Sequence, residues 1–536
     1  MGQSFKLVRH ERQEQIQRTI VTAQQMGEIE SRIFDAGMPV AALMEKVAMR
    51  VAHHIETRYP VNEFPQVGVI VGPGHNGGDG AVVARELHFS GYQVVLHRPL
   101  AKLKPLTEGH VNYATSLGIP LVSADELRAI NLIVDGLFGF GLTRPITNEL
   151  ADLVNLVNSL PASVVSIDLP SGLHTDTGEV LGTAIRATHT ACLGLWKRAF
   201  LQDRVLDYVG TPELIDFDIP LADVKAVIGE SPRWQRITAA QAIAPLPIPR
   251  PPTTYKYREG NLLLVCGSEQ YMGAAVLTGL AARASGVGML TLAIPQALKP
   301  VIAMQIPDAV TVGCPETESG AIAHFPDGLT LEKFSAIACG PGLSQDAIQA
   351  VKQVLASDRP LVLDADGLNI LAHLDPITTL SQRSAPTVLT PHPGEFKRLF
   401  PKLAEDLGDR LTAVQQAAQQ SGAVVLLKGA MVAIANAEGR GWVNPESTPA
   451  LARGGSGDVL TGLLGGLLAQ AASRQISPDL IAASAAWWHA QAGRQAAQQR
   501  GELGVDAQTL VDYLLDRKPE SRRQNSGGSW LLAPDS

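Results

Sequence analysis

Apolar residues recur with two different spacings along this chain. From about Ile20 to Tyr59 they return every three or four positions, which predicts helical structure. Beyond this segment, short β-branched runs alternate with helical stretches, a pattern typical of a mostly parallel sheet covered by helices on both faces. The first predicted strands span residues 67–71, 92–98, 131–139 and 163–172.

A break near residue 230 interrupts this alternation. Prolines crowd the segment APLPIPRPPTT (244–254) and disfavour the interior of a helix or sheet. We therefore predict two α/β domains, residues 1–229 and 230–520, followed by a polar tail over 521–536. In the second domain, strands are predicted over 261–268, 289–295, 334–342, 359–367, 386–395 and 423–436.

Composition favours a soluble enzyme that acts on small molecules. The net charge of −8 argues against nucleic acid or an anionic membrane as a partner, because both require clustered Lys and Arg. The longest apolar segment, 459–472, is shorter than the roughly 20 residues that span a bilayer. The four cysteines lack the paired spacing of a disulfide framework or zinc site. We expect a cytoplasmic protein that forms a homo-oligomer.

A glycine-rich segment, RGGSGD (453–458), precedes a long apolar helix. Glycines at a helix start leave backbone N–H groups free to point at an anion, and the helix dipole adds positive potential. Asp458 in this segment suits a reaction in which a hydroxyl loses its proton as it attacks a phosphoryl group. Aspartate is also a preferred N-cap, so a purely capping role stays open.

Together with T-P-H-P-G-E (390–395) and LDADGLN (363–369), this motif makes residues 235–515 resemble the ribokinase-like, ADP-dependent NAD(P)H-hydrate dehydratases. The resemblance implies Asp458 as catalytic base, ADP as co-substrate and a Mg²⁺ ion that bridges the phosphates, with Glu395 as an indirect organiser. Gly455, Ser456 and Gly457 would hold the developing negative charge. The implied nucleotide contacts are Lys428, Gly429, Ala430, Met431, Val432 and Gly457. The implied hydrate contacts are Ala274, Gly342, His392 and Asp458.

The stretch GPGHNGGDG (72–80) follows an apolar run and matches neither a Walker loop nor a dinucleotide fingerprint. We predict a glycine loop here. With AGMPVAALME (36–45), DGLFGFGL (135–142) and IDLPSG (167–172), it makes residues 20–225 resemble NAD(P)H-hydrate epimerase domains.

The epimerase resemblance implies a potassium ion held by Asn76, Asp135 and Ser171, and proton transfer by Asp168. Asp79 is expected to fix the loop through hydrogen bonds to backbone N–H groups. Judged from the residues alone, Asn, Asp and Ser at turns more often bond to the backbone, so structural roles stay open, for Asp168 as well. The implied substrate contacts are His75, Asn76, Gly77, Gly78, Asp79, Gly139, Phe140, Gly141, Leu142, Thr143, Arg144, Pro145 and Asp168.

The domain order resembles the bifunctional NAD(P)H-hydrate repair enzymes of prokaryotes. It implies a Rossmann-like three-layer α/β/α domain that epimerises the R and S hydrates of NADH and NADPH (NADHX and NADPHX). A ribokinase-like α/β domain would then dehydrate the S form, giving AMP and phosphate from ADP. Three residues depart from the family's common pattern: His75 replaces asparagine, Tyr255 histidine and Cys266 glycine. The alternative is a small-molecule kinase with a non-catalytic N-terminal binding module, although T-P-H-P-G-E in place of T-P-N-x-x-E weighs against it.

Overall fold

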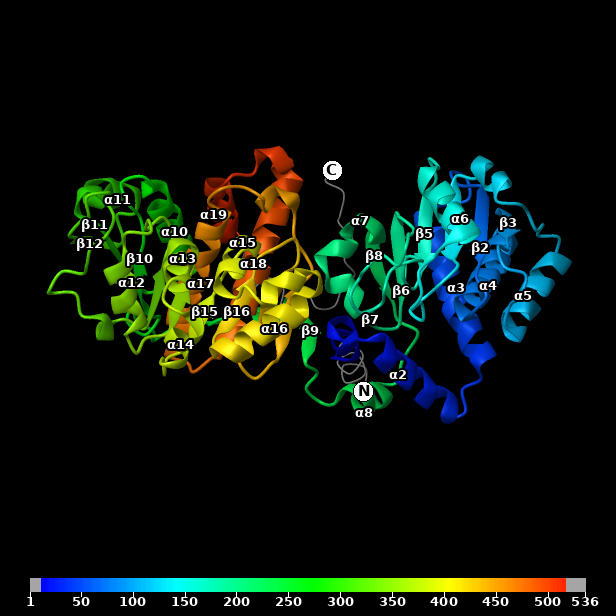
Figure 1. The fold of residues 1–536 in the computed structure, drawn as a ribbon, viewed down its shortest axis with the longest axis horizontal. Coiled ribbons are helices and arrows are strands. Elements are labelled where there is room, and N and C mark those ends of the chain that lie inside the picture. Colours follow the sequence, from blue (N-terminus) through cyan, green and yellow to red (C-terminus); the bar gives the residue numbers. More distant parts are fainter. Residues whose placement is uncertain (1–10, 517–536) are drawn as a thin grey trace. The chain divides into compact units, whose positions relative to one another are not determined.

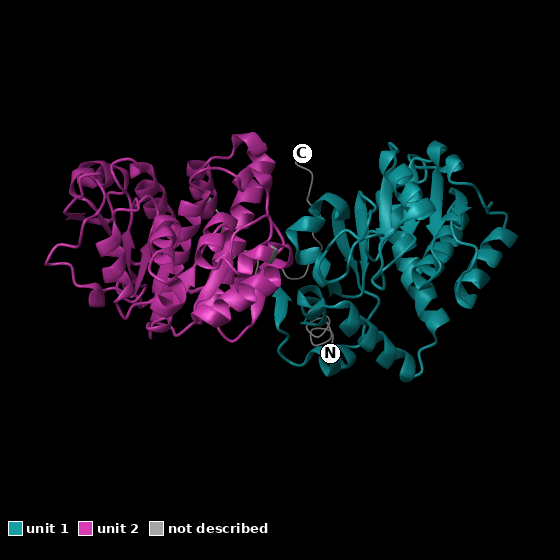
Figure 2. Cartoon of the chain, in the orientation of Figure 1, with its two compact units in different colours: residues 1–236 teal, residues 237–536 magenta. Residues whose placement is uncertain are grey.

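The computed structural model describes residues 11–516, and the chain forms two compact units, residues 1–236 and 237–536 (Figure 2). The unit boundary falls a few residues after the division expected at 229/230. The polar tail expected over 521–536 lies outside the described residues. Between residues 11 and 516, no helix has both the length and the apolar character needed to cross a membrane.

The first unit is built around a sheet with the strand order β3-β2-β4-β5-β6-β8, in which every neighbouring pair is parallel (Figure 1). Its strands are β2 (Gln66–Val71), β3 (Gln93–His97), β4 (Leu132–Gly136), β5 (Ser163–Ile167), β6 (His189–Leu193) and β8 (Thr211–Ile215). Residues 11–18 are helical, and the helices that follow in this unit are α2 (Ala23–Asp35), α3 (Val40–Arg58), α4 (His75–Phe89), α5 (Pro105–Ser116), α6 (Asn148–Ser159), α7 (Leu206–Val209) and α8 (Leu221–Ile228). A short strand, β9 (Trp234–Arg236), ends the unit.

Helices cover both faces of this sheet. Val69 of β2 belongs to one apolar core together with residues of α2, α3 and α4. Its neighbour Ile70 belongs to a second core with Val154 of α6. Because side chains alternate along a strand, adjacent residues of β2 serve opposite faces. The three-layer α/β/α fold expected for the N-terminal domain is confirmed.

A two-stranded parallel sheet joins the start of the described chain to the segment after β6. In it β1 (Ile20–Val21) pairs with β7 (Trp196–Lys197), and Val21 lies opposite Lys197. Thr22 then begins α2 with a capping box, in which its side chain and that of Gln25 each accept a backbone N–H. The helical pattern predicted between Ile20 and Tyr59 is confirmed as α2 and α3, but it starts only after β1.

In the second unit the strands lie in the order β12-β11-β10-β13-β14-β15-β16-β17-β18, parallel as far as β16 and antiparallel beyond it. The strands are β10 (Asn261–Val265), β11 (Met289–Pro295), β12 (Val310–Cys314), β13 (Ala336–Cys339), β14 (Leu361–Leu363), β15 (Thr387–Leu389), β16 (Val424–Leu427), β17 (Val432–Ala435) and β18 (Gly441–Asn444). The single strand predicted over 423–436 is therefore wrong, because the chain turns at Lys428 and returns as β17.

The helices of the second unit surround this sheet, and α17 is the most central. Gly462 of α17 lets it lie directly on α10, because a β-carbon at this position would be 2.1 Å from the carbonyl oxygen of Thr278. The helices are α9 (Ala239–Ile243), α10 (Met272–Ala284), α11 (Lys299–Gln305), α12 (Ile348–Leu355), α13 (Ala365–Ala372), α14 (Pro376–Ser381), α15 (Pro393–Leu399), α16 (Arg410–Ser421), α17 (Ser456–Ala472), α18 (Pro478–Arg500) and α19 (Ala507–Asp516). The two-domain α/β fold is confirmed.

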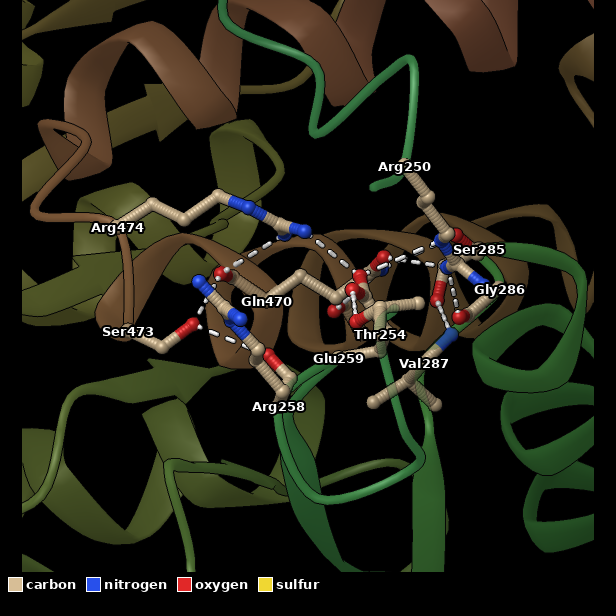
Figure 3. Close-up of polar contacts among 11 residues, drawn as sticks. Arg250, Thr254, Arg258, Glu259, Ser285, Gly286, Val287, Gln470, Ser473 and Arg474 are labelled. Atoms are coloured by element: carbon tan, nitrogen blue, oxygen red, sulfur yellow. Dashed lines mark hydrogen bonds and ion pairs between the residues drawn. The ribbon is translucent and has the colours of Figure 1, made fainter. Parts of the chain in front are cut away.

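The C-terminal end of α17 is held by the segment that leads into β10 (Figure 3). Glu259 is 3% exposed, lies 2.7 Å from the guanidinium of Arg474 and 3.3 Å from that of Arg250. Burial opposes its charge, but the Thr254 hydroxyl and the two arginines outweigh burial and lower the pKa of Glu259. These contacts fix α17 at one end and so help to position Asp458 at the other.

Candidate functional sites

A cavity of about 460 Å³ lies in the first unit where β2, β4 and β5 end. Carboxyl ends of neighbouring parallel strands gather at one edge of a sheet, which is where α/β proteins bind ligands. Gly77, Gly78 and Pro145 do not line this cavity. The predicted substrate residues that line it are His75, Asn76, Asp79, Gly139, Phe140, Gly141, Leu142, Thr143, Arg144 and Asp168.

The predicted glycine loop is wrong, because α4 already begins at His75. A β-carbon on Gly77 would lie 2.0 Å from the carbonyl oxygen of Gly72, so this glycine permits the helix to touch the preceding turn. Gly74 is the N-cap and no side chain caps the helix. The first-turn N–H groups of α4 therefore remain available to an anion.

Asp79 does not fix this turn as expected. It lies buried in α4, and among the described residues its carboxylate accepts no hydrogen bond from a backbone N–H. Burial raises the pKa of Asp79 well above its ordinary value, and the nearby Asp168 and Glu30 raise it further. Asp79 is thus an acidic group of the cavity rather than a loop anchor.

Asp168 follows β5 with a φ of 69°, a left-handed conformation that is uncommon outside glycine. Its carboxylate accepts hydrogen bonds from the Phe140 N–H at 3.0 Å and from the ammonium of Lys197, which also donates to the Leu193 carbonyl at 2.5 Å. Lys197 is completely buried. Burial opposes its charge, but Asp168 outweighs that effect and raises the pKa of Lys197, so a charged pair stands at the cavity wall.

The three predicted potassium ligands gather next to this pair. Asp135 is fully buried and accepts the Ser171 hydroxyl at 2.6 Å, together with the Ser166 hydroxyl and two backbone N–H groups. The amide nitrogen of Asn76 is buried and has no hydrogen-bond partner among the described residues. Asn76 Oδ1 and Asp168 Oδ2 lie 3.1 and 3.2 Å from the β-carbon position of Gly139. Within residues 11–516, no cluster of three His, Cys, Asp or Glu side chains could hold a metal ion, so a cation here would rely on neutral oxygens as well.

Sequence reasoning missed several residues of this cavity, among them Lys197 and Glu30. Both left a signal. Lys197 is the first cation after the apolar run ACLGLW, and Glu30 adjoins the apolar stripe of Met26, Ile29 and Ile33 on α2. Burial raises the pKa of Glu30 to about 7, which Lys197 opposes in part.

In the second unit, Asp458 lies in the first turn of α17 but does not cap it. The N-cap is Gly455, with a φ of 89°, and no side chain accepts the first-turn N–H groups. The capping alternative is therefore wrong. Burial raises the pKa of Asp458 to about 7, with a further increase from the carboxylate of Asp364 that Lys428 partly offsets.

An ion pair between a buried carboxylate and a partly exposed ammonium stands beside this helix start. Asp364 is 1% exposed and accepts hydrogen bonds from the Lys428 ammonium at 2.6 Å and the Thr461 hydroxyl at 2.5 Å. A β-carbon on Gly457 would lie 3.2 Å from the nitrogen of Lys428. The structure thus brings together Lys428 and Gly457, both predicted nucleotide residues, and adds Asp364, which had not been predicted as a site residue.

Arg410 supports the rest of the predicted nucleotide segment, which forms the turn from β16 to the first residue of β17. Its guanidinium donates to the carbonyl oxygen of Lys428 at 2.9 Å, and a β-carbon on Gly429 would lie 2.2 Å from it. Burial lowers the pKa of Arg410 to about 10. Sequence reasoning missed this residue, which lies in α16 and meets the turn only through the fold. The turn residues concerned are Lys428, Gly429, Ala430, Met431 and Val432.

The predicted hydrate residues fall into two groups. Gly342 has a φ of 62°, and a β-carbon there would lie 2.8 Å from those of Ala274 and Tyr271, so Ala274 and Gly342 are in contact. His392 is exposed and begins α15, where its ring nitrogen accepts the Gly394 N–H at 3.0 Å while the carboxylate of Glu395 accepts the N–H of His392 at 2.9 Å. The motif T-P-H-P-G-E therefore builds a helix cap.

The two family departures in this unit differ in exposure. Tyr255 is exposed, whereas Cys266 is buried at the end of β10 with Asp458 among its electrostatic neighbours. Burial raises the pKa of the Cys266 thiol. All four cysteines of the chain, Cys192, Cys266, Cys314 and Cys339, are buried and unpaired.

Comparison with known proteins identifies a family for each unit. Residues 40–199 match the family model of the YjeF-related protein N-terminus, and residues 262–516 match that of NAD(P)H-hydrate dehydratase. The bifunctional NAD(P)H-hydrate repair enzyme of Synechocystis sp. is 55% identical over 93% of this chain and 94% of its own length. That of Thermosynechococcus vestitus is 53% identical, with shares of 92% and 96%. An ADP/ATP-dependent NAD(P)H-hydrate dehydratase of Bacillus subtilis, solved with ATP and Mg²⁺, is 32% identical with a TM-score of 0.45, over 54% of this chain and 97% of its own. By its similarity to these relatives over most of its length, the chain belongs to the family of bifunctional NAD(P)H-hydrate repair enzymes.

Proposed function

We propose that this chain repairs hydrated nicotinamide cofactors in two steps. The first unit epimerises the R and S forms of NAD(P)H hydrate, and the second dehydrates the S form to NAD(P)H while ADP is converted to AMP and phosphate. Membership of the repair-enzyme family supports both activities. The observation that carries the proposal is Asp458, which lies among uncapped N–H groups of α17 with Lys428 at its side.

In the second unit, the difficulty is that a hydroxyl is a poor leaving group at neutral pH. Asp458 takes the proton of the substrate hydroxyl as that oxygen attacks the terminal phosphoryl group of ADP, and phosphate then departs as the ring double bond re-forms. The N–H groups of Gly455 and Gly457 stabilise the negative charge that develops, whereas that of Ser456 donates to the Arg453 carbonyl at 3.3 Å. A pKa of about 7 suits Asp458 to accept a proton near neutrality.

In the first unit, the carbon to be inverted carries both a hydroxyl and the ring nitrogen, so modest acid–base help can interconvert its two forms. Asp168 transfers a proton there, held in place by Lys197 and the Phe140 N–H. The phosphates of the substrate bind at the uncapped start of α4, where first-turn N–H groups and the helix dipole favour anions.

Two ions complete the proposal. Potassium would be held by the side-chain oxygens of Asn76, Asp135 and Ser171, and the buried Asn76 amide nitrogen without a partner is a donor that supports a substrate oxygen beside it rather than the cation. When bound, the ion supplies positive charge that orients substrate oxygens. Mg²⁺ in the second unit would be held mainly by the nucleotide phosphates and would neutralise part of their charge. Glu395 contributes indirectly, because its carboxylate already caps α15.

The test is recovery of NAD(P)H absorbance from a mixture of the R and S hydrates, with ADP or ATP and with potassium or sodium. The proposal expects NAD(P)H and inorganic phosphate, faster conversion of the R form with potassium, and ADP as the better nucleotide. A kinase with a non-catalytic N-terminal module would instead release a stable phosphoester and leave the R form unconverted, which would refute the proposal.

We also propose that the chain forms a homo-oligomer and works in the cytoplasm. Light scattering on the purified full-length chain would measure its mass in solution, and a monomer would contradict it. Fractionation of cells that express the chain tests its localisation.

A further inference from the structure

We propose that Glu30 is a second proton-transfer residue of the epimerase site and acts on the substrate hydroxyl as the partner of Asp168. This inference rests on the epimerase function proposed above. It assigns a role to a residue that none of the sequence motifs included.

The proposal rests first on which residues line the cavity of the first unit. Glu30, Asp168 and Lys197 all line it, although they come from α2, from the turn after β5 and from β7. A ligand in this cavity therefore meets carboxyl groups from two separate elements. Asp79 of α4 also lines the cavity and adds a third acidic group.

The small sheet of β1 and β7 fixes Glu30 relative to Lys197. Val21 pairs with Lys197, and α2 begins two residues later. The N–H of Ala23 donates to Asp176 at 2.8 Å, which anchors the first turn of the helix from the other side. With its start held and its apolar stripe buried, α2 places Glu30 at the wall of the cavity.

The two carboxyl groups differ in their partners. Asp168 accepts hydrogen bonds from Lys197 and from the N–H of Phe140, whereas no hydrogen bond or ion pair reaches the Glu30 carboxyl among the described residues. The charged groups that face Glu30 are Lys197 and Asp168, with Asp79 beyond, and burial raises the pKa of Glu30 to about 7. One cavity thus holds a paired carboxylate and a carboxyl that keeps its proton near neutrality, the arrangement expected of a base and an acid.

In one direction the step runs as follows. Protonated Glu30 gives its proton to the hydroxyl oxygen, the C–O bond breaks, and water leaves while the lone pair of the ring nitrogen forms a C=N bond. Water then adds to the opposite face of the planar carbon, and its proton passes to Asp168. The opposite hydrate results, and exchange of one proton between the two carboxyls through solvent restores the site. No other reactant is consumed.

The test compares Glu30→Gln with the wild-type full-length chain, and uses Glu28→Gln as matched control because Glu28 is exposed on the same helix. We expect Glu30→Gln to lower kcat for R-to-S conversion by about 100-fold or more with KM nearly unchanged, and Glu30→Asp to retain part of the activity. Wild-type kcat should fall as the pH rises through about 7, because Glu30 must be protonated, and this fall should be absent in Glu30→Gln. An unfolding transition of the first unit at the wild-type temperature reports that each variant is folded, and dehydration of pure S hydrate reports only that the second unit is intact.

A Glu30→Gln variant with wild-type epimerisation, or one that keeps the decline above neutral pH, would overturn the inference. If the wild-type chain itself converts no R hydrate, the proposed function fails instead, so the two failures are distinguishable.

Discussion

The two proposed catalytic aspartates, Asp168 and Asp458, differ in the charged groups around them. Asp168 lies against a buried ammonium, whereas Asp458 shares its surroundings with the carboxylate of Asp364. A neighbouring cation favours an ionised carboxylate, and a neighbouring anion opposes it. At the scale of single residues, the neighbouring Asp364 thus adds to burial in raising the pKa of Asp458.

Asn in place of Asp458 should abolish dehydration while leaving epimerisation intact. The amide cannot accept the proton of the attacking hydroxyl, so we expect kcat for S hydrate to fall by about a thousandfold. In the wild type, the rate should rise as the pH increases through about 7, where Asp458 loses its proton, by about tenfold between pH 6 and pH 8. Stopped-flow absorbance measures both effects. A rate that declines over this range would contradict a base at Asp458.

Removal of Lys197 should destabilise the first unit. In Lys197→Met, the carboxylate of Asp168 stays buried without its cation, and breaking such a pair typically destabilises by about 3–5 kcal/mol. The double variant Asp168→Asn, Lys197→Met should recover part of this loss, because no unpaired charge remains. Calorimetry of the single and double variants measures the coupling. Additive losses would show that the pair is not coupled.

Gly77 lets α4 lie directly against the turn that precedes it. In Gly77→Ala, the new β-carbon would meet the Gly72 carbonyl at 2.0 Å, so helix and turn must separate, at a cost of about 1–3 kcal/mol. Gly27→Ala in α2 is the control, since nothing lies within 4 Å of its β-carbon position and alanine favours a helix. Thermal unfolding should show a lower Tm for the first variant only. Equal Tm values would mean that the turn shifts away from the new β-carbon without a measurable loss of stability.

Elements with a clear apolar period were predictable from the sequence, and those that depend on packing were not. The run predicted at 289–295 coincides with β11, and that at 67–71 differs from β2 by one residue. The start of α4 was hidden because its glycines have low helix propensity, and close packing on the preceding turn compensates. The hairpin of β16 and β17 was hidden because both strands are apolar, so no change of period marks the turn.

The candidate sites divide in the same way. The residues carried by motifs gather at strand ends, as Asp135, Asp168 and Ser171 do. Lys197 and Glu30 are far apart in sequence and meet through β1 and β7, two-residue strands that leave no periodic signal. Motifs therefore located the cavity but missed part of its acid–base chemistry.

For the whole molecule, we expect the recovery of NAD(P)H from a mixture of R and S hydrates to follow a time course that depends on which unit is active. The wild type should restore all of the NAD(P)H. Asp168→Asn should restore the S fraction at normal speed and the rest only as fast as the R form epimerises without catalysis. Asp458→Asn should restore none while R and S still equilibrate. Absorbance combined with chromatography of the two hydrates follows all three, and full rapid recovery in Asp168→Asn would contradict the division of labour.

Burial of all four thiols should protect the folded chain against oxidation and alkylation. Peroxide and alkylating agents attack thiolates, and burial both shields these sulfurs and raises their pKa values, to about 12 for Cys192 and Cys314. The folded protein should thus stay active through an oxidative challenge that inactivates enzymes with exposed cysteines. Iodoacetamide should label it only when a unit opens.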